Sequence, residues 1–136
     1  MIDAVNVPVQ SVAANGSVLF ASTRIKTGCA TRHEAGSSRV ILLSPGVYRV
    51  SFNGNVSIPT GGTVAQTSVA IAQDGEPIAG STMLYTPAAV AVPGNISADV
   101  LVRVYQCCST STISVRNIGA DTINIQDANI VVTRES

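Results

Sequence analysis

One histidine and three cysteines are the side chains of this sequence best suited to nucleophilic catalysis and zinc binding. A nucleophile–His–acid relay requires a rigidly held imidazole, and His33 lies in the Gly- and Ser-rich segment 28–38. We therefore interpret His33 as a solvated loop residue. Structural zinc usually takes thiolates from spaced Cys pairs, whereas Cys107 and Cys108 are neighbours whose side chains would point to opposite faces of a strand. We predict no metal or cofactor site, and buried or half-exposed thiols for Cys29, Cys107 and Cys108.

Carboxylates are scarce, with eight acidic residues in the chain. Asp74 and Glu76 flank a glycine, while Asp121 and Asp127 are far from them in sequence. Glycoside cleavage needs two carboxylates across a cleft, usually in a groove rich in aromatic residues, and the sequence indicates no such groove. The Gly-x-Ser-x-Gly, Walker and His-Glu-x-x-His motifs are absent from the sequence. We therefore predict that the protein has no catalytic residues and is not an enzyme, and leave a calcium site in one of the loops as an alternative.

The composition indicates one folded domain with little charge. The chain has 136 residues, of which 46% are hydrophobic and 12% charged, and its formal net charge is zero. Low charge argues against a disordered chain, and a neutral domain lacks the field that holds a nucleic-acid backbone. The apolar runs are too short for a membrane span, and the N-terminus lacks the features of a secretory signal. We expect a protein made in the cytoplasm, with neither nucleic acid nor membrane as its partner.

The distribution of β-branched residues and turn residues predicts an all-β fold. Val, Ile and Thr are abundant, while Gly, Pro and Asn recur at short intervals. Extended segments are predicted at 5–9, 17–27, 39–43, 47–58, 63–73, 81–85, 96–106, 111–117 and 122–134, with 28–38 as a loop or irregular edge. Asp74-Gly75 predicts a hairpin turn. About eight to ten short strands in one domain indicate a β-sandwich, most often a jelly roll.

One segment carries a family resemblance. Residues 45–52, PGVYRVSF, resemble the PGxYxVSF strand of the C1q/tumour-necrosis-factor-like jelly rolls. Residues 74–81, DGEPIAGS, resemble the NGxPIPGS turn of bacterial members, which occur in collagen-like exosporium proteins and prophage-encoded structural proteins. With later strands at 99–104 and 115–117, the resemblance covers residues 17–134, and we take 17–136 as the jelly-roll domain. It implies a ten-stranded jelly roll that assembles as a homotrimer.

Strand alternation predicts which side chains would meet in such a trimer. If Tyr48, Val50 and Phe52 point into the sandwich, the residues between them point out, and the same holds for the valines at 100, 102 and 104. The outward set, expected to form the trimer interface, is Val47, Arg49, Ser51, Asp99, Leu101, Arg103 and Tyr105. The alternative is a solvated sheet face with scattered apolar residues.

These observations favour a structural protein of a bacteriophage virion, specifically a capsid decoration protein that contacts the major capsid protein. Residues 1–16 are the candidate for docking to the shell through Val5, Val7 and Val9, as an arm that adds a strand. An ordinary first strand of the domain is the other interpretation. The alternative function is a receptor- or glycan-binding head of a phage fibre or of a spore- or cell-surface protein. Aromatic platforms for sugars would have to come from Tyr48, Tyr85, Tyr105 and two Phe, and Tyr85 is expected to lie exposed near a loop.

Overall fold

The computed structural model describes residues 1–105 and 111–135, and it contains strands and no helix within these ranges. The strands are β1 (Ile2–Asn6), β2 (Gln10–Val12), β3 (Ser22–Lys26), β4 (Thr31–His33), β5 (Val40–Leu42), β6 (Gly46–Ser57), β7 (Thr67–Gln73), β8 (Glu76–Pro77), β9 (Met83–Tyr85), β10 (Gly94–Val104), β11 (Ser111–Asn117) and β12 (Ile123–Arg134). The all-β prediction is confirmed. In the described ranges there is also no helix of the length and apolar character that crossing a membrane requires.

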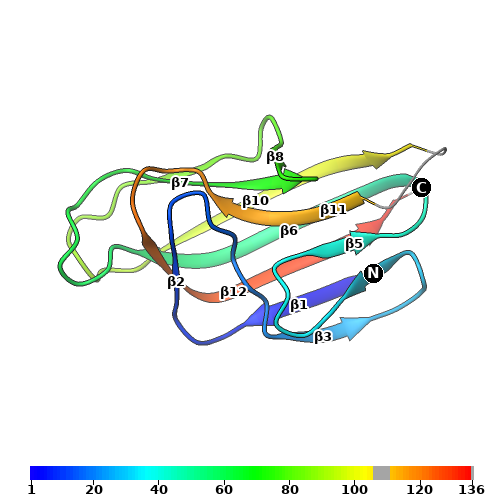
Figure 1. The fold of residues 1–136 in the computed structure, drawn as a ribbon, viewed down its shortest axis with the longest axis horizontal. Coiled ribbons are helices and arrows are strands. Elements are labelled where there is room, and N and C mark those ends of the chain that lie inside the picture. Colours follow the sequence, from blue (N-terminus) through cyan, green and yellow to red (C-terminus); the bar gives the residue numbers. More distant parts are fainter. Residues whose placement is uncertain (106–110, 136) are drawn as a thin grey trace.

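The strands form two antiparallel sheets that lie face to face (Figure 1). Sheet A has the order β10-β6-β12-β1-β3, with β2 also paired to β12. Sheet B has the order β4-β5-β11-β7-β8, with β9 also paired to β7. Both termini lie at the same end of the sandwich (Figure 1). Strands distant in sequence are therefore neighbours, as in the jelly roll that the sequence predicts.

The core is formed by alternate side chains of the long strands. Tyr48, Val50 and Phe52 of β6 are 0%, 0% and 1% exposed, which confirms the predicted inward face. Facing them from sheet B are Ile113 and Val115 of β11, both fully buried. The hydroxyl of Tyr48 donates to the carbonyl of Ser44 at 2.6 Å, so its polar end is satisfied although the ring is buried.

The Asp74-Gly75 prediction is also confirmed. β7 pairs with β8 so that Gln73 lies opposite Glu76, which leaves two residues in the turn. Asp74 and Gly75 have φ angles of 53° and 87°, the left-handed values that a type I′ turn requires at both positions.

Residues 1–16 form part of the sandwich. β1 pairs with β12 on one side and with β3 on the other, so neither of its edges is free to add a strand. β2 pairs with β12 as well. This arrangement is that of an ordinary first strand of the domain, and docking through residues 1–16 stays a prediction.

The buried Asn117 joins the end of β11 to two loops. Its side-chain nitrogen donates to the carbonyls of Val12, Ala13 and Asp121 at 3.2, 3.3 and 2.8 Å. Its side-chain oxygen accepts from the backbone N–H of Gly119 at 3.0 Å. One fully buried amide thus satisfies backbone groups from both loops at this end of the sandwich.

We expect Asn117→Ala to lower the free energy of unfolding by about 2–3 kcal/mol, because it leaves several backbone groups without partners. Asn124→Ala, at a half-buried position of β12, serves as the control, with an expected loss of about 0.5 kcal/mol or less. Urea unfolding followed by circular dichroism measures both. Equal losses for the two variants would contradict the structural role of Asn117.

Candidate functional site

The seven residues predicted for an interface lie together on the outer face of two adjacent strands. In the antiparallel pairing of β6 and β10, Leu101 lies opposite Arg49, and Arg103 lies opposite Val47. Asp99 lies opposite Ser51, and Tyr105 directly follows the end of β10. Alternate residues of both strands point into the core, which turns this set toward the outside of sheet A. We call these seven residues the β6/β10 face.

Two large apolar side chains of the β6/β10 face are open to solvent. Leu101 is 58% exposed and Tyr105 is 71% exposed. The guanidinium carbon of Arg103 lies 5.1 Å from the centre of the Tyr105 ring, within the range of a cation–π contact. An apolar surface with an aromatic ring and an arginine has the composition that is enriched at protein–protein interfaces.

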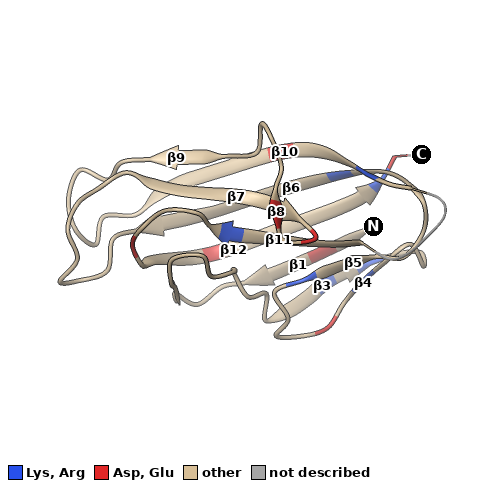
Figure 2. Ribbon diagram, turned by 45° about the horizontal axis from the view of Figure 1, so that its top comes forward, with Lys and Arg blue, Asp and Glu red and all other residues tan. Residues whose placement is uncertain are grey.

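Charged groups line the same face. Arg49 Nη1 lies 3.1 Å from Asp99 Oδ2, and Arg49 Nε lies 3.6 Å from Glu135 Oε1. All three side chains are about half exposed, so these ion pairs contribute little to the stability of the single chain. Most Lys and Arg residues lie in the half of the sandwich that carries the termini (Figure 2). Because these exposed ion pairs are weak, the arginines of this face can also pair with carboxylates of another molecule.

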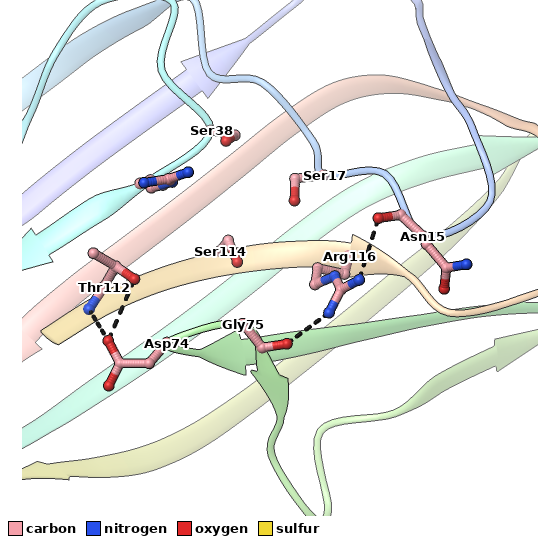
Figure 3. A pocket seen from close by; sticks show the side chains of 9 residues that line it. Asn15, Ser17, Ser38, Asp74, Gly75, Thr112, Ser114 and Arg116 are labelled. Atoms are coloured by element: carbon pink, nitrogen blue, oxygen red, sulfur yellow. Dashed lines mark hydrogen bonds between the residues drawn. The ribbon is translucent and has the colours of Figure 1, made fainter.

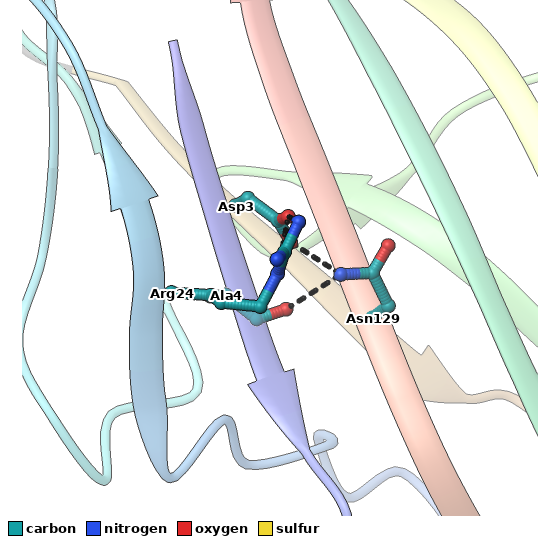
Figure 4. A network of polar contacts seen from close by, with 4 residues as sticks. All are labelled: Asp3, Ala4, Arg24 and Asn129. Atoms are coloured by element: carbon teal, nitrogen blue, oxygen red, sulfur yellow. Dashed lines mark hydrogen bonds and ion pairs between the residues drawn. The ribbon is translucent and has the colours of Figure 1, made fainter.

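Toward the opposite edge of sheet A, β1 and its neighbours hold a polar network that the sequence analysis missed, drawn in Figure 4. Asp3 of β1 is 7% exposed and accepts hydrogen bonds from Arg24 Nε and Nη2 at 3.1 and 2.9 Å. Asn129 of β12 also donates to Asp3, and to the carbonyl of Ala4 at 3.4 Å. The network ties β1 to both neighbouring strands. The signal in the sequence is weak, because the three side chains are brought together only by strand pairing.

We expect Asp3→Ala to lower the free energy of unfolding by about 1–2 kcal/mol, since it removes the acceptor of three charge-assisted bonds. Arg24 is largely exposed and stays hydrated in the variant, which keeps the loss moderate. Thermal unfolding measures the effect, with Asp121→Ala on an exposed loop as the control. A variant as stable as the parent would show that the network contributes nothing.

The residues predicted to dock on a shell are divided between a strand and a loop. Val5 is a half-buried residue of β1, opposite Asn129 of β12. Val7 and Val9, in the connection to β2, are 62% and 54% exposed. The sequence analysis missed Leu19, which is 50% exposed and lies beside this connection because its backbone N–H and C=O both bond to the side chain of Gln10.

The interpretation of His33 as a solvated loop residue is wrong. His33 belongs to β4 and is half-buried, with Nε2 donating to the carbonyl of Ser37 at 3.0 Å and Nδ1 2.8 Å from Thr23 Oγ1. Its ring also packs edge-on against Phe20, with the centroids 6.3 Å apart. Pairing of β4 with β5 orders a segment whose composition resembles a loop.

The other candidates for chemistry are found in different settings. The prediction of a buried or half-exposed thiol is wrong for Cys29, which is an exposed free thiol in the segment between β3 and β4. Cys107 and Cys108 lie outside the described residues. The part of the chain that the structure describes holds no group of three or more His, Cys, Asp or Glu placed to bind a metal ion. The carboxylate of Asp74 accepts bonds from Ser111 Oγ and from the backbone N–H of Thr112 at 2.7 and 2.9 Å, so it stabilises the start of β11.

Tyr85 differs from expectation. It was predicted to be exposed near a loop, but it lies in β9 and is half-buried. A Cβ on Gly94 would lie 2.2 Å from Cζ of the Tyr85 ring, so the ring packs directly on the start of β10. The side of the ring that packs on Gly94 is therefore not available to stack on a sugar.

Comparisons with known proteins identify the fold. No family model matches the chain, and no curated protein sequence matches it. Among solved structures, Eiger TNF from S. frugiperda aligns over 99% of this chain and 92% of its own, with a TM-score of 0.71 and 10% identity. The globular domain of zebrafish complement 1qA aligns over 96% and 94%, with a TM-score of 0.67 and 9% identity. Vertex protein P5 of the phage PRD1 aligns over 99% and 96%, with a TM-score of 0.56 and 14% identity.

Identities this low carry information about the fold alone. The likeness spans nearly the whole length of each chain, so it includes both sheets and their connections. The protein is therefore a single jelly-roll β-sandwich whose fold is similar to those of the C1q and TNF structures.

Proposed function

We propose that the protein is a non-enzymatic structural component of a bacteriophage virion, where it forms a homotrimer that decorates the head surface. The observation that carries this proposal is the β6/β10 face. There the exposed Leu101 and Tyr105 lie beside Arg49, Arg103 and Asp99 on one regular surface.

The β6/β10 face has what a symmetric contact between identical copies requires. Apolar side chains provide area to remove from water, and arginines and a carboxylate on the same surface can pair with their counterparts on the next copy. Closed symmetry lets each copy bury the same residues without leaving an unpaired surface. A chain of zero net charge adds no long-range repulsion between copies.

The place on a virion is supported by the fold and by a second surface. Vertex protein P5 of PRD1 shares this fold over nearly the full length of both chains. We propose that the exposed Val7 and Val9, together with Leu19, contact the major capsid protein or another virion surface protein. In this proposal the chain is made in the host cytoplasm and assembles there onto the particle, with neither nucleic acid nor membrane as a partner.

Two measurements test the proposal. Native mass spectrometry of the purified protein at micromolar concentration is expected to give the mass of three chains, and a monomer would contradict the trimer. Antibody labelling of phage particles from lysates of cells that carry the gene is expected to mark the heads in electron micrographs. Labelling of tail fibres only, or of spores or cell surfaces only, would contradict head decoration and favour a receptor- or glycan-binding head.

A further inference from the structure

The outer side of sheet B contains a polar pocket where β11 changes its pairing partner. The first half of β11 pairs with β5, from Ser111 opposite Leu42 to Ile113 opposite Val40. Beyond this point the same edge is taken over by residues 15–18, through a bridge between Ser17 and Arg116 and a bond from the N–H of Val18 to the carbonyl of Val115. Between β5 and residues 15–18, along this edge of β11, lies a pocket of about 490 Å³. This volume is within the size range of ligand sites.

The pocket is lined by polar side chains from four segments (Figure 3). Its lining consists of Asn15, Ser17, Ser38, Arg39, Asp74, Gly75, Thr112, Ser114 and Arg116. Four hydroxyl groups and an amide are therefore present, while valine, leucine, isoleucine and aromatic side chains are absent from this lining. Such a surface suits a ligand that itself carries many hydroxyl groups, because each hydroxyl both donates and accepts.

Ser114 has a hydroxyl without a protein partner. It is 8% exposed and its neighbours Ile113 and Val115 point into the core, so its side chain points outward into the pocket. No hydrogen bond joins Ser114 Oγ to another group of the described residues. Its oxygen is not fully withdrawn from solvent, so it is open to a hydrogen bond with a ligand in the pocket.

The two arginines differ in how they are held. Arg116 donates to the carbonyls of Gly75 and Asn15 at 2.6 and 3.3 Å and is thereby fixed in the wall. The guanidinium of Arg39 makes no ion pair or hydrogen bond with the described part of the chain. Asp74 is already bonded to Ser111 and Thr112. With two arginines and one carboxylate, the pocket has a net positive charge in a chain whose total charge is zero.

Hydrogen bonds outside the pocket join two of the segments that line it. The N–H of Phe20 donates to the carbonyl of Ser37 at 3.2 Å, and the N–H of Gly36 donates to the carbonyl of Phe20 at 3.0 Å. His33 adds its bond to Ser37, so the segment with Ser38 is joined to the segment with Ser17. A site held in this way has less conformational entropy to lose when it binds a ligand.

We propose that this pocket binds a saccharide that bears a carboxylate, with Arg39 pairing with the carboxylate and the Ser and Thr hydroxyls bonding to the sugar ring. This activity goes beyond the proposed structural function. The pocket lies on sheet B and the β6/β10 face on sheet A, so it stays open in a trimer formed through that face. Three copies on one particle would bind a polymer of acidic sugars with avidity.

The test is a titration of the isotope-labelled protein with sodium D-glucuronate, D-glucose and sodium acetate, followed by two-dimensional NMR. Glucuronate is expected to shift the backbone signals of Ser38, Arg39, Thr112 and Ser114 in a saturable manner. Glucose lacks the carboxylate and acetate lacks the hydroxyls, so the affinity of each is expected to be at least about tenfold lower than that of glucuronate. No saturable shift with glucuronate, or shifts elsewhere in the protein, would overturn the proposal, as would glucose or acetate binding as tightly as glucuronate.

Arg39→Met is expected to weaken glucuronate binding about tenfold, because it removes the charge but keeps the length of the side chain. Arg32→Met, at another exposed arginine, is the matched control and should bind as the parent does. Ser114→Val, which fills the pocket with a side chain that strands favour, should also weaken binding. Unchanged binding in both pocket variants would overturn the proposal. Binding is measured in the Leu101→Asp variant as well, so that failure of the trimer and failure of the pocket are distinguished.

Discussion

Leu101→Asp is expected to convert the trimer into folded monomers. The side chain is 58% exposed in the single chain, so a carboxylate there costs little until a second copy covers it. Replacing an apolar side chain by a charge inside an interface costs about 3 kcal/mol or more, which lowers the association constant roughly 100-fold for each contact. Sedimentation velocity at micromolar concentration measures the change.

Leu84→Asp is the matched control for this variant. Leu84 lies in β9 at the edge of sheet B and is 57% exposed, nearly the same as Leu101. It is expected to leave the trimer intact. If Leu84→Asp dissociates the trimer and Leu101→Asp does not, the copies meet through the other sheet and the β6/β10 face is a solvated surface. Circular dichroism of both variants verifies that the sandwich is still folded.

Phe52→Ala is expected to cause the largest loss of stability, about 3–5 kcal/mol. Phe52 is 1% exposed at the middle of β6, where it lies opposite Ala98 on one side and Ile130 on the other. Its ring also meets that of Phe20 edge-on, with centroids 6.4 Å apart, so alanine leaves a cavity and removes an aromatic pair.

The loss is measured by urea unfolding in the Leu101→Asp background, where concentration-dependent association does not contribute. Phe52→Leu keeps most of the apolar volume and is expected to lose about 1–2 kcal/mol. A loss below 1 kcal/mol for Phe52→Ala would mean that the packing of β6 has been described incorrectly.

Much of the sandwich was predictable because successive side chains of a strand point to opposite faces, so the buried face shows as alternate apolar residues. The alternation around Tyr48, Val50 and Phe52 placed β6 and its buried side correctly. The turn at Asp74-Gly75 was predictable because its chemistry is local, the two residues being those that accept left-handed φ angles most readily. The outward position of Leu101 followed from the same alternation in β10.

Prediction failed where the surroundings of a side chain come from other strands and loops, even ones nearby in sequence. His33 was expected to be solvated, but Thr23, Ser37 and Phe20 surround it because β4 joins the edge of sheet B. Tyr85 was expected to be exposed, but it covers Gly94 at the start of the next strand, β10. Leu19 was missed because its exposure beside the β1–β2 connection depends on a bond to the side chain of Gln10.

The amino-acid sequence by itself determined the fold class, the positions of the long strands and the side of each strand that faces the core, since these follow from periodicity and turn chemistry over a few residues. Only the tertiary structure decided that β1 and β2 are built into sheet A, that Asp3, Arg24 and Asn129 meet, and that β11 exchanges β5 for residues 15–18 and leaves a polar pocket. Each of these depends on which strands pair, and pairing is set by the packing of the whole sandwich.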